Sequence, residues 1–174
     1  MKRLILLRHA KTEVWNEGVA DRDRKLLTRG HKDAGAVSAE LSKIGWAPDR
    51  ALVSTARRTR ETWRHLHETF PACQVSLLDE LYLASVPTIQ DAITRAAEDA
   101  STLMLIGHNP GMHETALSIM QQSGTVDPGA ARKLEEKLPT GTAVLFESDE
   151  DEAFIPVHFR MAGWIRPKLF RSPI

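Results

Sequence analysis

The sequence has few of the features that mark specialised classes of protein. Its 174 residues include one cysteine, Cys73, which excludes an internal disulfide and leaves too few thiolates for a structural zinc site. Lys plus Arg and Asp plus Glu number 23 each, so no net field would draw the chain to nucleic acid or to a membrane surface. No apolar run approaches the length of a membrane span, and the one at the start is too short for a signal peptide. We therefore expect a cytoplasmic protein that binds neither nucleic acid nor membrane.

Glycine-rich phosphate-binding motifs are also absent. The chain contains neither G-x-x-x-x-G-K-[ST] nor G-x-G-x-x-G, so nothing indicates a loop that holds a nucleotide by its backbone amides. What is present is ordinary for one globular domain, with 42% hydrophobic and 26% charged residues. There is no internal repeat and no linker rich in Pro, Gly or Ser. We expect a single domain that spans residues 1–174.

Short apolar runs alternate with segments of helical periodicity along most of the chain. Continuous apolar runs of this length are typical of strands buried on both faces of a sheet. We expect such strands at 4–7, 50–54, 74–78, 101–107 and 142–148, with a weaker edge strand at 153–159. Apolar residues at helical spacing predict helices at 28–45, 56–70, 86–100 and 111–124. The alternation predicts a three-layer α/β/α sandwich with a mostly parallel central sheet.

Two segments depart from this alternation. The polar segment 123–141 is expected to form a mobile surface excursion, with a short helix at 129–137. The basic and aromatic segment 159–174 is expected to form a C-terminal tail whose Trp164 and Phe170 pack on the domain. Binding of a partner protein or an anion is the alternative role for this tail.

Cationic and imidazole side chains follow three of the expected strands. The first strand runs into Arg8 and His9, the second into Ser54 and then Arg58, and the fourth into His108. Ligands of open α/β sheets bind beyond the carboxyl ends of the strands, so these side chains meet if the three strands are parallel neighbours. Arginine presents a planar fork of donors to phosphate oxygens, and a neutral histidine can attack phosphorus. The pattern therefore predicts a pocket for a phosphoryl group.

Four sequence blocks resemble those of a known family in their order and spacing. They are LRHAK (7–11), STARRTRET (54–62), DELY (79–82) and IGHNPG (106–111). Together they resemble the histidine phosphatase (phosphoglycerate mutase-like) superfamily, and in particular its short SixA-type phosphohistidine phosphatases, over roughly residues 3 to 148. The resemblance implies a phosphoglycerate mutase-like fold and a phosphatase that forms a covalent phosphohistidine intermediate. It also implies that no metal or other cofactor takes part.

The resemblance assigns roles to individual positions. His9 matches the nucleophile, and Arg8 and Arg58 match the two phosphate-binding arginines. His108 matches the second histidine, which donates to the phosphoryl oxygens. Glu80 lies where many relatives place the acid that protonates the leaving group; an ordinary carboxylate after a strand is the alternative. Repulsion from the two arginines is expected to lower the pKa of His9 and keep it neutral.

The sequence also departs from the family pattern in places. Thr55 stands where proline is common, which should alter only the local turn. Residues 25–28 read KLLT where relatives have R-P-L-T, so any substrate contact made by that segment is in doubt. Arg57 is one position away from the phosphate-binding arginine and is expected at the surface. The remaining histidines are expected to be structural or exposed: His31, His65, His67, His113 and His158.

Three functions remain open from the sequence. A phosphatase acting on protein phosphohistidine is the first, because the chain is short and no segment is long enough to close a deep lid over the site. A phosphatase acting on a small phosphomonoester is the second. The third is a non-catalytic module that binds a phosphorylated partner in the same pocket, although the nucleophile is present rather than replaced. The expected partner is thus a phosphorylated protein or a small phosphorylated molecule, and the oligomeric state is open.

Overall fold

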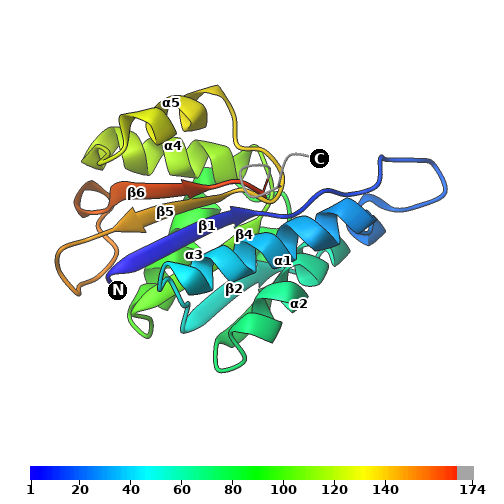
Figure 1. Ribbon diagram of the computed structural model, residues 1–174, viewed down its shortest axis with the longest axis horizontal. Helices are drawn as coiled ribbons and strands as arrows, with labels where there is room; N and C mark the ends of the chain where they lie inside the picture. Colours follow the sequence, from blue (N-terminus) through cyan, green and yellow to red (C-terminus); the bar gives the residue numbers. More distant parts are fainter. Residues whose placement is uncertain (168–174) are drawn as a thin grey trace.

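The protein is built on one six-stranded sheet (Figure 1). The computed structural model describes residues 1–167. The strands follow the order β3-β2-β4-β1-β5-β6; β1 to β4 are parallel, and β5 is antiparallel to both β1 and β6. Their bounds are β1 Arg3–Arg8, β2 Arg50–Ser54, β3 Gln74–Leu78, β4 Thr102–Gly107, β5 Ala143–Glu147 and β6 Arg160–Ile165.

Helices cover both faces of the sheet, which confirms the expected α/β/α sandwich. The helices α1 and α2 pack together over one face, and α3, α4 and α5 cover the other (Figure 1). Their bounds are α1 Thr28–Lys43, α2 Arg57–Thr69, α3 Val86–Ala97, α4 Gly111–Ser123 and α5 Pro128–Glu136. Short 3-10 helices form at η1 Asp21–Asp23, η2 Asp79–Leu81 and η3 Pro156–His158.

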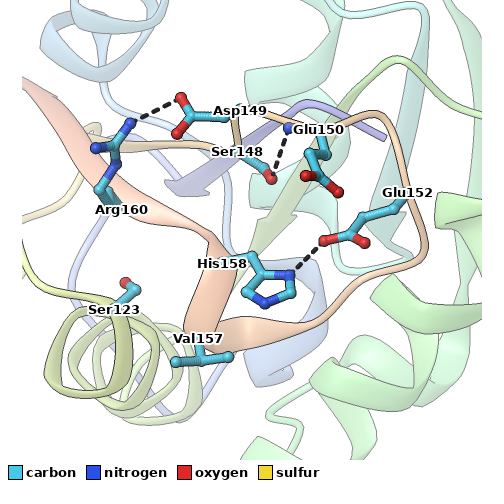
Figure 2. Close-up of a pocket in the computed structure, with 8 residues that line it drawn as sticks. All are labelled: Ser123, Ser148, Asp149, Glu150, Glu152, Val157, His158 and Arg160. Carbon is cyan, nitrogen blue, oxygen red and sulfur yellow. Dashed lines mark hydrogen bonds and ion pairs between the residues drawn. The ribbon is translucent and has the colours of Figure 1, made fainter.

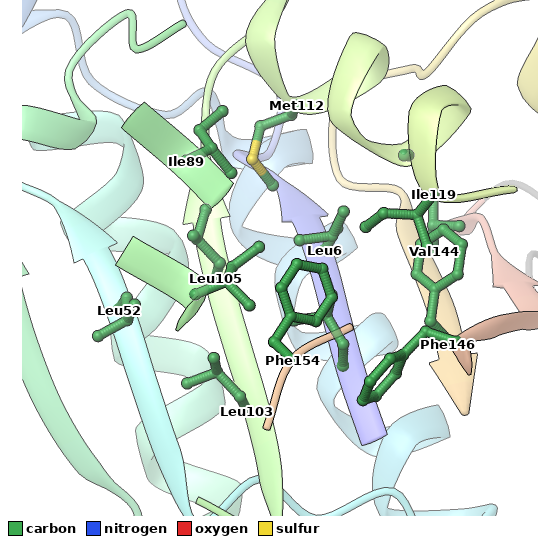
Figure 3. Close-up of a cluster of buried hydrophobic side chains, with 14 of the residues drawn as sticks. Leu6, Leu52, Ile89, Leu103, Leu105, Met112, Ile119, Val144, Phe146 and Phe154 are labelled. Atoms are coloured by element: carbon green, nitrogen blue, oxygen red, sulfur yellow. The ribbon is translucent and has the colours of Figure 1, made fainter. Parts of the chain in front are cut away.

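The central strand β1 shows how the sequence creates two cores from one run of apolar residues. Successive side chains of a strand point to opposite faces. Leu4 and Leu6 therefore join the core under α3, α4 and α5, whereas Ile5 and Leu7 join the core under α1 and α2. Figure 3 shows the first core, in which Leu6 packs among side chains from the sheet and α4. A strand that is buried on both faces needs no polar alternation, which explains its continuous run of apolar residues.

The strand order brings three carboxyl ends together. Strand β4 lies between β1 and β2 and is parallel to both. Its last residue, Gly107, pairs with Arg8, and Ile106 pairs with Val53 next to the end of β2. The three strands that are followed by cationic or imidazole side chains are thus neighbours inside the sheet, and their carboxyl ends lie side by side.

Two strands at the edges of the sheet differ from the sequence-based expectation. Strand β3 forms at the expected residues but is not buried, because it is an edge strand; Val75 and Leu77 are 42% and 51% exposed. The expected strand at 153–159 is wrong. Pro156, which cannot donate to a ladder, begins η3, and the edge strand β6 forms only afterwards.

The segment after α4 is more closely packed than expected. The short helix is present as α5. Asp127 caps its amino-terminal end, where the side-chain carboxylate accepts a hydrogen bond from the amide of Ala130. Leu134 is fully buried in the core with residues of α4. The expected short helix within segment 123–141 thus forms and packs on the domain.

The expected C-terminal tail 159–174 contains the edge strand β6 in its first half. Trp164 lies on this strand and packs against the core, as expected. Phe170 lies outside the described residues. No helix within residues 1–167 has the length and apolar character needed to cross a bilayer.

Candidate active site

His9 lies directly after β1 and is buried, with 6% of its surface exposed. Its Nδ1 is 2.8 Å from the carbonyl oxygen of Ala10. A carbonyl can only accept, so Nδ1 carries the proton and Nε2 of the neutral ring keeps its lone pair. The amide of Ala10 donates to the Thr62 hydroxyl at 3.0 Å, which fixes the turn after β1 against α2. The imidazole is therefore held in one tautomer with Nε2 available to react.

The two arginines reach the site from different elements. Arg8 ends β1, and its Nη1 donates to the carbonyl of Leu138 at 3.0 Å. Arg58 lies in the first turn of α2 with 2% of its surface exposed, and its Nη1 and Nη2 donate to the carbonyl and the carboxylate of Asp21 at 2.7 and 3.0 Å. Arg8 is thus held through one terminal nitrogen and Arg58 through both. Arg57, next in sequence, pairs with Glu61 and is about half exposed, as expected.

His108 follows β4 and faces His9. The two ring centroids are 5.4 Å apart. The Nε2 atom of His108 lies 2.7 Å from the hydroxyl of Ser54, the residue that ends β2. With the Ser54 hydroxyl donating to Nε2, the proton of the neutral ring lies on Nδ1. Ser54 thereby aims the second imidazole, a role that the sequence did not assign to it.

Three nitrogen donors in this group are buried without a partner. They are Nε of Arg8, Nε of Arg58 and Nδ1 of His108. Leaving a buried donor unsatisfied costs about 1–3 kcal/mol, so three in one place need a physical explanation. An oxyanion that accepts from all three would supply it.

The electrostatics of the site favour neutral histidines. Burial is the largest cause that lowers the pKa of His9 well below its usual value; the Ala10 carbonyl opposes this, and His108 and the two arginines add to it. The pKa of His108 falls to about 3, first through burial and then through the charge of Arg58. The pKa of His9 is thus lowered, as expected, but burial contributes more to the shift than repulsion from the arginines.

Asp21 and Tyr82 complete the site and were not predicted from the sequence. The hydroxyl of Tyr82 donates to the carboxylate of Asp21, which also binds Arg58, and the Tyr82 ring lies edge-on to His108 with centroids 5.5 Å apart. Partial burial alone would raise the pKa of Asp21, but the Tyr82 hydroxyl and the Arg58 guanidinium lower it to about 2. Tyr82 is the single tyrosine of the chain and ends the DELY block, which was a usable signal. Asp21 begins the short 3-10 helix η1 in the long connection between β1 and α1, and the sequence offered no signal for it.

Glu80 is separate from this group in the structure. It lies on η2, and its carboxylate pairs with Arg95 of α3. Its neighbour Asp79 accepts from the hydroxyl of Thr55 at 2.5 Å and from Arg22 at 3.0 Å. Thr55, in the position where proline is common, therefore links β2 to η2 in addition to altering the turn.

The remaining histidines make structural contacts. His31 of α1 and His65 of α2 contact each other through Nδ1 and Nε2 at 2.9 Å, and His113 contacts the carbonyl of Leu134 at 2.6 Å. Among residues 1–167, no group of three or more His, Cys, Asp or Glu side chains is arranged to hold a metal ion.

A cavity of about 270 Å³ lies at the other end of the strands from His9 (Figure 2). It is beside the amino-terminal end of β1, where the amide of Ser148 donates to the carbonyl of Lys2. Its charged residues are paired with one another: Arg160 binds Asp149 at 2.9 Å, and His158 binds Glu152. Four of the charged side chains that line this cavity thus have partners, whereas three donors around His9 have none.

Comparison with known proteins agrees with this geometry. Residues 4–104 match the family model of the histidine phosphatase superfamily (branch 1). An uncharacterized protein of Mycobacterium tuberculosis is 37% identical over 140 residues, which cover 80% of this chain and 85% of that protein. Residues 4–104, which match the family model, include His9, Arg8 at the end of β1 and Arg58 on α2.

Solved structures extend the match over almost the whole fold. A SixA-type protein from Agrobacterium tumefaciens superposes with a TM-score of 0.81 at 26% identity and covers 95% of this chain and 98% of its own. A second, from Nakamurella multipartitia, superposes with a TM-score of 0.80 at 28% identity and covers 95% and 96%. With the family match and the relative at 37% identity, they show that this chain belongs to the histidine phosphatase superfamily, in its SixA-type branch, and is a phosphatase.

Proposed function

We propose that the protein hydrolyses a phosphorylated substrate through a covalent phosphohistidine formed on His9. The observation that carries this proposal is the set of three unpartnered donors on Arg8, Arg58 and His108 around a buried imidazole with a free Nε2. A phosphoryl group is tetrahedral and anionic, so its oxygens can accept from several donors while its phosphorus faces Nε2.

In the first step, Nε2 of His9 attacks phosphorus. The new N–P bond forms as the bond from phosphorus to the leaving group breaks, and the electron pair of that bond departs with the leaving group. Arg8 and Arg58 stabilise the charge spread over the equatorial oxygens. The hydrogen bond from Nδ1 to the Ala10 carbonyl stabilises the positive charge that the ring gains. In the second step, water attacks phosphorus, the N–P bond breaks, and inorganic phosphate and neutral His9 are released.

Protonation of the leaving group favours phosphohistidine as the substrate. The departing imidazole of a phosphohistidine can be protonated on its remote nitrogen before cleavage, whereas the alkoxide of a phosphate ester needs an acid at the departing oxygen. Glu80 is held by Arg95 in this structure. Asp21, the carboxyl group within the site, stays ionised because Tyr82 and Arg58 lower its pKa to about 2, so it has no proton to give. The similar structures that carry the SixA phosphohistidine phosphatase name support the same substrate class. We therefore propose protein phosphohistidine ahead of a small phosphomonoester, with no metal in the reaction.

Steady-state turnover of a phosphohistidine peptide and of a generic phosphate ester tests the proposal. We expect His9→Ala to abolish turnover and Arg58→Ala to reduce kcat by about 10²–10³, the usual cost of one lost charge-stabilising donor. EDTA should change neither rate, and the peptide should be the better substrate. Near-normal activity of His9→Ala would overturn the mechanism. Inhibition by EDTA would overturn its independence of metal, and faster ester hydrolysis would favour the small-molecule alternative.

Glu80→Gln separates the acid role from a structural one, with Glu98→Gln at the end of α3 as a matched control for the lost charge. Loss confined to the ester would assign the acid to Glu80. Equal loss on both substrates would mean that the pair with Arg95 matters for structure alone.

A further inference from the structure

A second cavity adjoins the candidate active site and shares Arg8 with it. Its volume is about 330 Å³. The charged side chains that line it are those of Arg8, Lys11, Arg29, Asp33, Lys137 and Arg166. They come from the end of β1, the loop after it, the first two turns of α1, the end of α5 and the residue after β6. Chain segments that are distant in sequence thus contribute cations to one place.

The charge of this cavity is strongly unbalanced. Five cationic residues and one carboxylate line it, although the whole chain has equal numbers of acidic and basic residues. Asp33 lies 3.7 Å from Arg29 and offsets that charge. Within the described part of the chain, no ion pair involves Lys11, Lys137 or Arg166. Like charges around a small volume repel one another, and a bound anion would relieve that repulsion.

Backbone contacts hold the walls of the cavity in place. A Cβ atom on Gly30 would lie 2.1 Å from the carbonyl oxygen of Lys11, so only glycine lets the loop approach the first turn of α1 this closely. That same oxygen accepts from the amide of Leu27 at 2.9 Å. On the other wall, the amide of Gly141 donates to the carbonyl of His9 at 2.9 Å, and Arg8 donates to Leu138. The cations are therefore carried by backbone that is tied to the active site itself.

We propose that this cavity is a second anion-binding subsite, which takes a carboxylate or phosphate group carried by the same substrate molecule as the transferred phosphoryl group. The inference rests on the proposed function, because it places the phosphoryl group on Arg8 and Arg58. Arg8 donates to Leu138 through Nη1 and lines the cavity, while its Nε is unpartnered. One guanidinium can thus contact both anionic groups of a single substrate. The cavity selects phosphorylated substrates that bear a second negative charge near the phosphoryl group.

The double variant Lys137→Gln/Arg166→Gln tests the subsite without touching the proposed catalytic residues. Its matched control is Lys2→Gln/Lys43→Gln, which also removes two positive charges, at exposed positions outside this cavity. The probes are phosphoglycolate and ethyl phosphate, which differ in a carboxylate. A phosphohistidine peptide with a neighbouring Glu and its Gln counterpart form a second pair. The intrinsic reactivities of two probes cancel when their kcat/KM ratio is compared between proteins.

We expect the double variant to lower the ratio of kcat/KM for the anionic over the neutral probe by about tenfold, since contacts to charged groups are the stronger hydrogen bonds. Ethyl phosphate turnover should stay within about twofold of wild type. The probe pair that shows the effect identifies its source as a small acid or an acidic peptide. An unchanged ratio in both pairs, or an equal change in the control, would overturn the subsite.

Failure of the proposed function gives a different result. If the wild-type protein turned over none of the four probes, the proposed substrate classes and mechanism would fall. Calorimetry would then give the dissociation constants of phosphoglycolate and ethyl phosphate, and the ratio of these two constants would be compared between proteins. Equal effects of the two double variants on those constants would overturn the subsite as well.

Discussion

At the scale of single residues, the site could be predicted where residues follow strands and could not where they lie in loops. His9, Arg8 and His108 were found because each ends or follows a buried apolar run, whose direction in the sheet fixes where the next side chain lies. Asp21 lies in the long connection between β1 and α1, where no periodicity constrains the path of the chain. Its contact with Arg58 depends on tertiary structure alone.

Asp21 positions Arg58, and this can be tested. Removing the carboxylate charge with Asp21→Asn should weaken inhibition by inorganic phosphate about tenfold, because a charge-assisted hydrogen bond that orients Arg58 is lost. Tyr82→Phe removes a partner of Asp21 but leaves its contact with Arg58, so its effect should be smaller.

The inhibition constant for phosphate and the free energy of unfolding should both be measured. A structural role would lower the free energy of unfolding and leave the inhibition constant unchanged, which would contradict the positioning role. The pKa of Asp21 is about 2 when folded and nearer 3.8 in an unfolded chain, so the stability that its carboxylate contributes is present above pH 3.8 and is lost toward pH 2.

At the scale of helices and strands, the sequence was most informative about the buried centre of the sheet. β1, β2 and β4 are covered on both faces, so burial leaves a continuous apolar run that can be read directly. The edge strands β3 and β6 carry a weaker signal, because one side of an edge strand has no neighbour in the sheet. The position of β6 was accordingly misassigned, and β3 was expected to be buried.

Helix α5 provides a test at this scale, because it was expected to be peripheral. Leu134 is fully buried, so Leu134→Ala should lower the free energy of unfolding by about 2–5 kcal/mol through lost apolar contacts and the resulting cavity. Lys133→Ala, on the exposed side of the same helix, is the matched control and should change stability by less than about 0.5 kcal/mol. Urea denaturation measures both variants. Equal, small effects would show that α5 contributes little to the core.

At the scale of the whole molecule, balanced overall charge conceals a marked local asymmetry. At the carboxyl ends of the parallel strands, unpartnered donors surround His9, and cations without an ion pair among the described residues line the adjoining cavity. At the other end of the strands, charged residues lie in pairs around the cavity of Figure 2. Composition could not reveal this difference, because it depends on which segments the fold brings together. We expect this asymmetry to favour anionic ligands at the carboxyl ends of the parallel strands.

The most direct measurement is to incubate the protein with a radiolabelled phosphoryl donor, quench the reaction and map the labelled residue. We predict a base-stable, acid-labile label on His9, which is absent from His9→Ala and retained in the control Lys2→Gln/Lys43→Gln. A label on any other residue, or turnover with no labelled protein at any time of quenching, would contradict the account.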